Sequence, residues 1–283
     1  MRYRTYRPGP SLADFVAYIW ALHDAPGHSR ERIVPSGTLE LVVNLREDSV
    51  RIYDPSLGVW RRFSGAVVSG AYRRYFVIDT RDHASIVGVH FKPGGAWPFL
   101  GVPPGELADQ HIDLEMLWGR SAIALREQLC TAATTADRFA VLEAALRLRL
   151  PELRSGHPAV RVALEQLDRP RATVGGVATG LQLSHRRFIE VFTAEVGMTP
   201  KRLSRVLRFQ RASALARRGP PPDWGALAVA CGYSDQSHLI HDVSEFTGTS
   251  PRQLGPASEQ VKELHMAVPD EVKFLQDACR AHP

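Results

Sequence analysis

The chain has 283 residues, a length that allows either two domains or one large one. Hydrophobic residues make up 44% of the sequence and charged residues 23%, which is typical of soluble globular proteins and excludes collagen, coiled-coil and long disordered chains. The three cysteines form no CxxC pair, and the sequence has no apolar run of 18 residues. We therefore expect a cytoplasmic protein with no disulfide framework and no membrane span.

The net charge of +5 favours an anionic partner, and this charge is unevenly distributed along the chain. Residues 157–255 hold 13 Lys and Arg against 8 Asp and Glu, whereas the preceding 156 residues hold 19 against 17. Residues 184–218 have a local net charge of +7, and residues 219–255 have one of −3. The positive charge is therefore concentrated in one segment of the C-terminal half.

The first 150 residues are predicted to form an α+β domain that is rich in strands and closed by helices. Short runs of alternating apolar residues, separated by turn residues, predict strands near residues 15–22, 39–45, 50–53, 59–68, 75–79 and 85–91. From about residue 113, apolar residues recur every three or four positions, which predicts two helices separated by TAATTAD.

Every later element is predicted to be helical. Residues 151–158, PELRSGHP, have the composition of a short linker between domains. Apolar spacing then predicts an all-α domain over residues 159–255, followed by a tail, residues 256–283, with one amphipathic segment at 268–278. The expected helices are residues 159–167, 174–181, 184–196, 200–217, 224–231 and 235–246.

The all-α domain contains one internal repeat. Val177-Ala178 and Leu227-Ala228 each precede a turn, a capping residue and a helix that ends at Gly197 or Gly248. Two short helices joined by a tight turn are typical of a helix-turn-helix, whose second helix fits the major groove of DNA. The helix between the two copies is about 27 Å long at 1.5 Å per residue, and the same face of DNA recurs about every 34 to 36 Å. One linker helix can therefore hold two recognition helices for adjacent major grooves.

These motifs resemble a known family. ALAVACGYSDQSHLIHDVSEFTGTSPRQL (226–254) and LSHRRFIEVFTAEVGMTPKRL (183–203) resemble the DNA-binding domain of AraC/XylS-type transcription regulators. IVPSGTLELVVNL (33–45) and GVHFKPGGAWPFLGVPPGEL (88–107) are similar to the sensor-side domain of one subclass. The resemblance implies a two-domain bacterial regulator that binds double-stranded operator DNA. It also implies that the N-terminal domain, residues 1–150, controls the regulator by binding an effector or by mediating dimerisation.

The resemblance also implies which residues contact DNA. Candidates for base contacts are Ser184, His185, Arg186, Arg187, Ile189 and Glu190 in the first motif and Gln236, Ser237, His238 and His241 in the second. Arg186 suits guanine, Glu190 suits cytosine and Gln236 suits adenine. Three residues of the linker helix, Lys201, Arg205 and Arg208, are expected to form a basic stripe that contacts phosphates.

The sequence departs from the family pattern in the second motif above all. Glu190 and His241 stand where an arginine is usual, and Ser244-Glu245 replaces a common basic pair. We therefore expect the first motif to supply most of the DNA affinity, and the second to select sequence or to dock on a partner such as RNA polymerase. The alternative interpretation is a protein-interaction module in which DNA binding is vestigial.

The sequence predicts no catalytic site, cofactor or metal. It has no P-loop, dinucleotide fingerprint or nucleophile elbow, and His238 and His241 lack a third metal ligand nearby. A small-molecule effector is an open alternative, for which six aromatic residues are candidate pocket-lining groups: Trp20, Tyr53, Trp60, Tyr72, Tyr75 and Trp97. Because one chain already carries two recognition helices, both a monomer and a homodimer fit the sequence.

Overall fold

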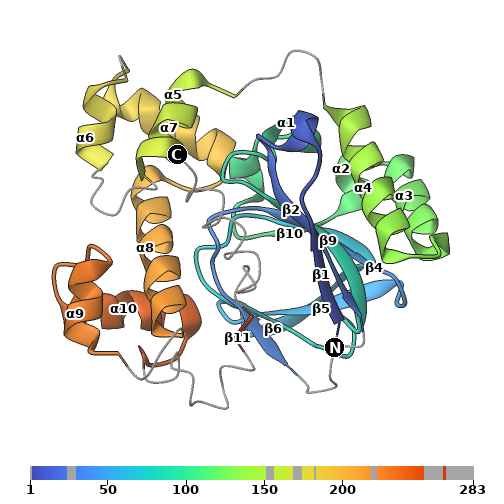
Figure 1. Ribbon diagram of the computed structural model, residues 1–283, viewed down its shortest axis with the longest axis horizontal. Helices are drawn as coiled ribbons and strands as arrows, with labels where there is room; N and C mark the ends of the chain where they lie inside the picture. The colour runs from blue at the N-terminus through green and yellow to red at the C-terminus, as the bar shows by residue number, and fades with distance from the viewer. Residues whose placement is uncertain are drawn as a thin grey trace, which may run out of the picture.

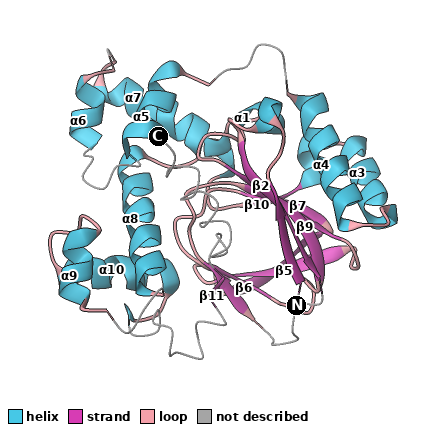
Figure 2. Cartoon of the chain, viewed as in Figure 1, coloured by secondary structure: helices cyan, strands magenta, loops and turns pink. Residues whose placement is uncertain are grey.

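In the computed structural model the chain is described over residues 2–23, 30–150, 156–167, 174–181, 183–217, 222–251 and 264–265. The N-terminal half consists of two β-sheets with helices packed on one side (Figure 1). The C-terminal half is helical and lies beside the sheets (Figure 2). No helix in the described part of the chain is long and apolar enough to cross a membrane.

Over the described residues, the first sheet has six antiparallel strands in the order β1-β2-β9-β4-β7-β10. These are β1 (Arg2–Tyr6), β2 (Val16–His23), β9 (Ser85–Phe91), β4 (Glu40–Asn44), β7 (Ala66–Ser69) and β10 (His111–Asp113). Both faces of the central strands are buried, because helices cover one face of the sheet and the second sheet covers the other. Alternate side chains of a strand therefore enter different cores. Leu41 and Val43 of β4 belong to the core shared with the helices, and Val42 belongs to the core between the two sheets.

The second sheet has the strand order β11-β3-β8-β5-β6. Its members are β3 (Glu31–Ile33), β8 (Phe76–Ile78), β5 (Ser49–Asp54), β6 (Val59–Ser64) and β11 (Leu264–His265), of which β11 pairs in parallel with β3. The two sheets enclose a second apolar core that includes Trp20, Ile52 and Phe76. This core surrounds the cavity described below.

Helices of the N-terminal half cover the other face of the first sheet. They are η1 (Pro10–Leu12), α1 (Trp97–Leu100), η2 (Pro104–Leu107), α2 (Leu114–Trp118), α3 (Arg120–Thr131) and α4 (Thr135–Arg149). Helix α4 begins with a capping box, in which Thr134 and Asp137 satisfy each other's backbone N–H groups. Its apolar residues Phe139, Leu142 and Leu146 are buried.

The C-terminal half consists of short helices around one longer helix. They are α5 (Pro158–Leu167), α6 (Val174–Thr179), α7 (His185–Val196), α8 (Pro200–Ala216), α9 (Trp224–Ala230) and α10 (Gln236–Thr247). Each predicted helix of this half is confirmed to within two residues at either end. Helices α7 and α10 end at Gly197 (φ 85°) and Gly248 (φ 68°), whose left-handed backbone favours glycine.

One hydrophobic core runs through both halves. Phe91 and Leu114 of the N-terminal half and Phe192, Val206 and Phe246 of the C-terminal half belong to the same buried cluster. The cluster forms because the apolar faces of α7, α8 and α10 leave the solvent on packing against each other and against the sheet domain.

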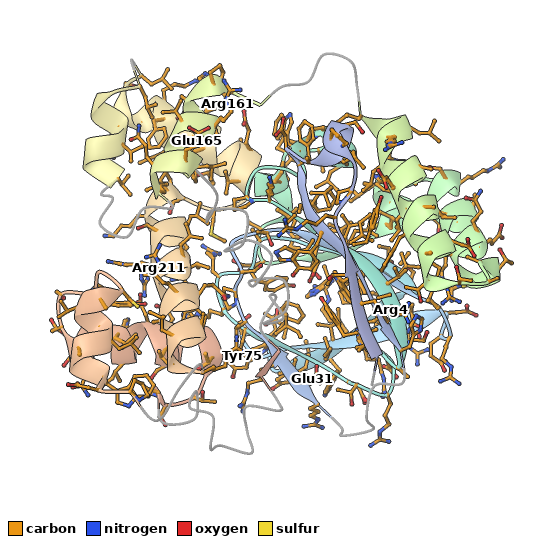
Figure 3. All side chains as sticks on the ribbon, in the orientation of Figure 1. Arg4, Glu31, Tyr75, Arg161, Glu165 and Arg211 are labelled. Carbon is orange, nitrogen blue, oxygen red and sulfur yellow. The ribbon has the colours of Figure 1, made fainter. Side chains whose placement is uncertain are left out.

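Close backbone contacts mark the junction between the halves. A Cβ atom at Gly105 of η2 would lie 2.8 Å from the carbonyl oxygen of Thr193 on α7. At Gly37, a Cβ atom would lie 2.6 Å from the side chain of Leu203 on α8. Farther along, Tyr75 packs against Gly248 at the end of α10 (Figure 3). The N-terminal half therefore contacts α7, α8 and the end of α10 directly.

Several sequence-based boundaries were wrong. The strand predicted over residues 59–68 is two strands, because the chain passes at Gly65 from β6 in the second sheet to β7 in the first. The helix predicted from residue 113 is divided at Gly119 (φ 55°) into α2 and α3. Strands β1, β3, β10 and β11 were not predicted, and β11 corrects the expectation that every element after the linker is helical. The tail segment 268–278 and linker residues 151–155 lie outside the described residues.

Candidate nucleic-acid interface and N-terminal cavity

Helix α7 carries the predicted base-contacting residues of the first motif on its exposed face. The Ser184 hydroxyl caps the helix by accepting a hydrogen bond from the Arg187 backbone N–H at 3.2 Å. The opposite face is buried through Phe188, Phe192 and Val196. Burial of this face leaves Ser184, His185, Arg186, Arg187 and Glu190 exposed and Ile189 half-buried.

Arg186 and Glu190 form an ion pair on the exposed face of α7. The Arg186 Nε lies 3.0 Å from Glu190 Oε1, and Arg187 Nη1 lies 3.5 Å from Glu190 Oε2. The hydrogen bond from Arg186 lowers the pKa of the Glu190 carboxyl. Because the Arg186 side chain is 91% exposed, the pair is hydrated and its guanidinium can exchange Glu190 for another acceptor.

Helix α10 presents the second predicted set of residues. The Asp235 carboxylate caps it by accepting a hydrogen bond from the His238 backbone N–H at 2.8 Å, which lowers the pKa of Asp235. Gln236, Ser237 and His241 are exposed, and His238 is half-buried against the Tyr233 ring. Leu239, Val243 and Phe246 anchor the opposite face in the core.

The two predicted sets lie on opposite sides of α8. Helices α6 and α7 lie on one side of α8 along its length and α9 and α10 lie toward the other (Figure 1), and α10 contacts α8 through Arg202, Arg205 and Phe209. With 17 residues, α8 is about 25 Å long at 1.5 Å per residue. The structure thus keeps the predicted residues in two groups, each on its own N-capped helix.

Two residues of the expected basic stripe on α8 are engaged within the protein. The Arg205 guanidinium donates to Asp242 Oδ1 from its Nε at 3.0 Å, and it also donates to Glu245. Arg208 donates to the carbonyl oxygen of Gly232 at 3.1 Å and lies over the Tyr233 ring. The expectation of an open stripe is therefore corrected: among its three members, Lys201 is the exposed one.

A second arginine completes this internal cluster, and sequence reasoning missed it. Arg202 Nη1 donates to Glu245 Oε1 at 2.6 Å, and its Nη2 donates to the carbonyl oxygen of Arg73 in the N-terminal half. Burial alone would raise the pKa of the Glu245 carboxyl, but the hydrogen bonds from Arg202 and Arg205 lower it below its usual range. The one feature of the sequence that could have indicated this cluster is that the basic segment, residues 184–218, is followed directly by the acidic segment, residues 219–255.

This cluster changes the interpretation of the acidic second motif. Asp242 is fully buried and Glu245 is 20% exposed, and both pair with arginines of α8. Two of the four acidic residues that give residues 219–255 their negative charge therefore do not face a binding partner as free charges. The prediction that the second motif binds phosphate weakly was made from the net charge alone. It is weakened, because two of the negative charges that it counted are paired inside the protein.

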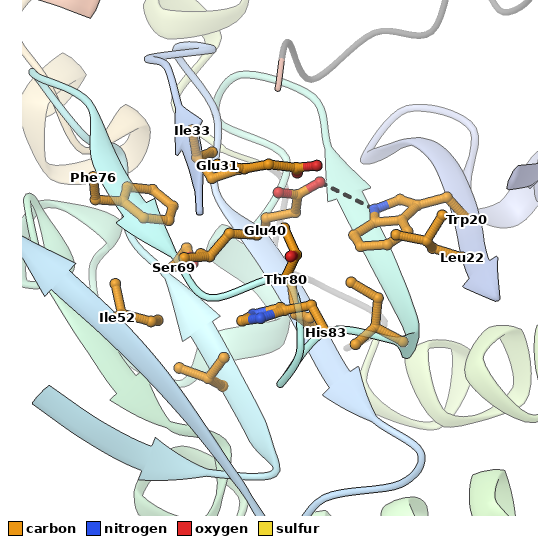
Figure 4. Close-up of a pocket in the computed structure, with 14 residues that line it drawn as sticks. Trp20, Leu22, Glu31, Ile33, Glu40, Ile52, Ser69, Phe76, Thr80 and His83 are labelled. Atoms are coloured by element: carbon orange, nitrogen blue, oxygen red, sulfur yellow. Dashed lines mark hydrogen bonds between the residues drawn. The ribbon is translucent and has the colours of Figure 1, made fainter. Parts of the chain in front are cut away.

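The N-terminal half contains a cavity of about 70 Å³ between the two sheets (Figure 4). Its walls are mostly apolar, and its polar residues come from both sheets and from the turn that follows β8. The lining residues are Trp20, Leu22, Glu31, Ile33, Glu40, Val42, Ile52, Val67, Ser69, Phe76, Ile78, Thr80, His83 and Ile86.

One of the six predicted pocket aromatics lines this cavity. Trp20 does so, and its Nε1–H donates to Glu40 Oε1 at 3.0 Å. Tyr53 and Trp60 instead contact each other on β5 and β6, and Tyr72 packs against Phe76 and His111. The sequence could not separate these positions, because aromatic residues serve the core and a pocket equally well.

Two family models match parts of the chain. Residues 4–113 match a family described as a domain of unknown function, DUF6597, and residues 177–255 match a family described as a helix-turn-helix domain. The second match spans α7, α8, α9 and α10. A search of curated proteins finds no match.

The similar solved structures include ToxT from Vibrio cholerae. An apo variant of ToxT is 12% identical with a TM-score of 0.46, covering 83% of this chain and 96% of that one. The P21 crystal form is 9% identical with a TM-score of 0.43, covering 90% and 98%. Wild-type ToxT bound to an unsaturated fatty acid is 10% identical with a TM-score of 0.42, covering 83% and 93%.

Proposed function

We propose that this chain, whose helix-turn-helix domain is of the AraC type, reads adjacent major grooves of operator DNA with α7 and α10. The observation that carries this proposal is the arrangement of two N-capped helices with exposed polar faces on opposite sides of α8. A helix N-terminus is suited to the major groove, where its first residues reach base edges.

The two helices offer different chemistry to the DNA. Arg186 and Arg187 on α7 provide guanidinium groups for guanine or phosphate, and Glu190 is an acceptor for the cytosine amino group. On α10, Gln236 suits adenine, while Ser237, His238 and His241 provide further hydrogen-bonding groups. We therefore assign most of the salt-dependent affinity to α7 and Lys201, and sequence discrimination to both helices.

Control through the N-terminal half fits the contacts between the halves. An effector that favours one arrangement of the sheets changes the surface on which α7 and α8 rest, and so shifts the population of DNA-binding conformations. The cavity between the sheets is the proposed effector site. The chain acts in this scheme without catalysis, as a monomer or as a homodimer.

A second candidate function is docking on a protein such as RNA polymerase through the second helix-turn-helix. Val229 on α9 is 60% exposed and Ile240 on α10 is 38% exposed, so this motif presents apolar side chains to the solvent. Exposed apolar groups beside a polar rim are typical of protein contacts. In the alternative interpretation this docking is the main activity and DNA binding is vestigial.

Selection of bound duplexes from a random-sequence pool tests the proposal with the full chain. The expected winner contains two short motifs about one helical turn apart, and it binds far more tightly than a scrambled duplex. Equal, weak binding of both duplexes would reject operator reading and favour the docking function.

A matched pair of variants then tests α7. Arg186→Ala should reduce discrimination at one base pair by about 5- to 150-fold, the range for a lost bidentate contact. Arg161→Ala removes the same side chain from the exposed face of α5 and should leave discrimination unchanged. The assignment of Arg186 fails if both variants keep the sequence preference of the parent chain.

A further inference from the structure

One carboxylate on the exposed face of α7 pairs with two arginines through separate oxygen atoms. Arg186 Nε lies 3.0 Å from Glu190 Oε1, and Arg187 Nη1 lies 3.5 Å from Glu190 Oε2. All three residues are exposed, and they lie within the first two turns of the helix. The start of α7, which is proposed to meet DNA, therefore carries two positive charges and one negative charge in contact with each other.

Among the residues of α7, all of which the structure describes, Glu190 is the one exposed acid. The other carboxylate of the helix belongs to Glu195, which is 9% exposed and accepts a hydrogen bond from the His157 backbone N–H at 2.8 Å. The hydrogen bond from Arg186 lowers the pKa of Glu190, so its carboxylate is charged at neutral pH. An anion that approaches the exposed face of α7 therefore meets the negative charge of Glu190.

This negative charge opposes binding to the DNA backbone. The start of α7 attracts phosphates, because its free backbone N–H groups and its two arginines are positive. A phosphate that replaces Glu190 as the partner of an arginine is brought within the Debye length of the carboxylate, about 8 Å at physiological salt, so the two anions repel each other. Glu190 therefore weakens contacts that any DNA sequence could make.

The base edges in the major groove differ in what they offer to a carboxylate. Cytosine presents its N4 amino group, which donates to a carboxylate, and adenine presents its N6 amino group beside the acceptor N7. Guanine and thymine present acceptors there, which a carboxylate repels. A cytosine opposite Glu190 thus replaces the hydrogen bond that is lost when Arg186 turns to a base or a phosphate.

We propose that Glu190 is the specificity-determining residue of α7, because its carboxylate weakens binding to every sequence except one that places a cytosine amino group opposite it. Arg186 and Arg187 supply affinity, and Glu190 decides at which sequences that affinity is realised. At this position the chain should prefer cytosine, tolerate adenine and reject guanine and thymine. This inference rests on the proposed function, in which α7 enters the major groove, and it adds the residue and the base that set the choice.

Two substitutions separate the charge of Glu190 from its hydrogen-bonding oxygen atoms. Glu190→Gln removes the charge and keeps an acceptor, and Glu190→Ala removes both. Glu165→Gln makes the same change as the first variant on the exposed face of α5 and is the control (Figure 3). Because the Glu190 side chain is 47% exposed and its ion pairs are hydrated, all variants should unfold close to the temperature of the parent chain.

Titration of a scrambled duplex at several salt concentrations measures the repulsion. Both Glu190 variants should bind this duplex about fivefold more tightly than the parent, the factor for one exposed charge interaction. The slope of log affinity against log salt should steepen by about 0.9, the value for one more phosphate contact. Glu165→Gln should match the parent, and unchanged or weaker binding by either Glu190 variant would overturn the proposal.

Selection from the random-sequence pool, repeated with each variant, measures the base preference. The parent should favour cytosine over guanine at one position by about 5- to 150-fold. Glu190→Gln should shift this position towards adenine, whose N6 and N7 suit an amide, and Glu190→Ala should show no preference there. A position that stays cytosine in the parent and in both variants would overturn the assignment of Glu190.

The same measurements separate this inference from the proposed function. If the parent selects a two-part motif and both Glu190 variants select the same motif, the regulator function stands and this inference is wrong. If the parent selects no motif, operator reading and the cytosine contact are both rejected. Tighter binding of the scrambled duplex by the Glu190 variants would then still show that this carboxylate repels DNA.

Discussion

Arg205 illustrates how a cation that looks available in the sequence is engaged inside the fold. Its partner Asp242 has a fully buried side chain, and the Arg205 side chain itself is 21% exposed. Removing one member of a buried pair leaves the other charge without compensation, which costs about 3 to 5 kcal/mol. Because Arg205 retains some contact with water and Glu245 keeps Arg202 as a partner, we expect the lower end of that range.

The prediction compares Arg205→Met with Lys201→Met, which remove one positive charge each from α8. Arg205→Met should destabilise the chain by about 3 kcal/mol, equivalent to a fall in unfolding temperature on the order of 6 to 12 °C. Its effect on the salt dependence of operator binding should be negligible. Lys201→Met should leave the unfolding temperature unchanged and reduce the slope of log affinity against log salt by about 0.9, the value for one lost phosphate contact.

Thermal unfolding followed by circular dichroism, together with operator titrations at several salt concentrations, measures both quantities. Replacing the pair together, Arg205→Met with Asp242→Leu, should recover most of the lost stability, because no buried charge is then left alone. The reasoning is refuted if Arg205→Met keeps the parent unfolding temperature and reduces the salt slope. In that case Arg205 contacts phosphate, as the sequence first indicated.

Three further predictions concern stability. Gly105→Ala places a methyl group 2.8 Å from the carbonyl oxygen of Thr193 and should destabilise the chain by about 1 to 3 kcal/mol, measured by thermal unfolding; an unchanged midpoint would contradict close contact between the halves. By contrast, Gly175→Ala on α6 meets nothing within 4 Å and should stabilise by up to about 1 kcal/mol in denaturant titration. Burial, and then the charge of Arg61, lowers the pKa of His111 from 6.5 to about 3 in the folded chain. The unfolded chain therefore takes up a proton at His111 before the folded chain does, and the free energy of unfolding decreases as pH falls from 6.5 towards 3. Between pH 7 and pH 5, the free energy of unfolding should therefore decrease by about 2 kcal/mol more in the parent chain than in His111→Phe.

The helices of the C-terminal half were predictable because each has its own local signals. Ser184, Thr199 and Asp235 cap the starts of α7, α8 and α10, and Gly197 and Gly248 mark two ends. These signals act within a few residues of the chain, so no tertiary information is needed to place the helices.

The strands were less predictable because several of them are too short to show alternation. Strands β3 and β10 have three residues each, and pairing partners far along the chain define them. Strand β1 reads RYRTY, in which arginines mask the alternating pattern until pairing with β2 fixes its register.

The candidate sites divide in the same way. The exposed faces of α7 and α10 follow from helical periodicity once the buried residues are identified. The pairing of Arg205 with Asp242, 37 positions apart, depends on how α8 and α10 pack, and the cavity depends on the gap between two sheets. Charge counted along a sequence is therefore a weak guide to charge that a partner can reach.

The shared core also constrains how such a regulator can be recombined. Leu203 and Gly197 fit against Gly37 and Ala71, so a helix-turn-helix region taken from a relative would meet a surface shaped for other side chains. A functional chimaera must therefore take both sides of this contact from the same parent, even when each of the two matched regions, residues 4–113 and 177–255, is transferred intact. The two halves are thus expected to diverge together, with substitutions on one side of the contact answered on the other.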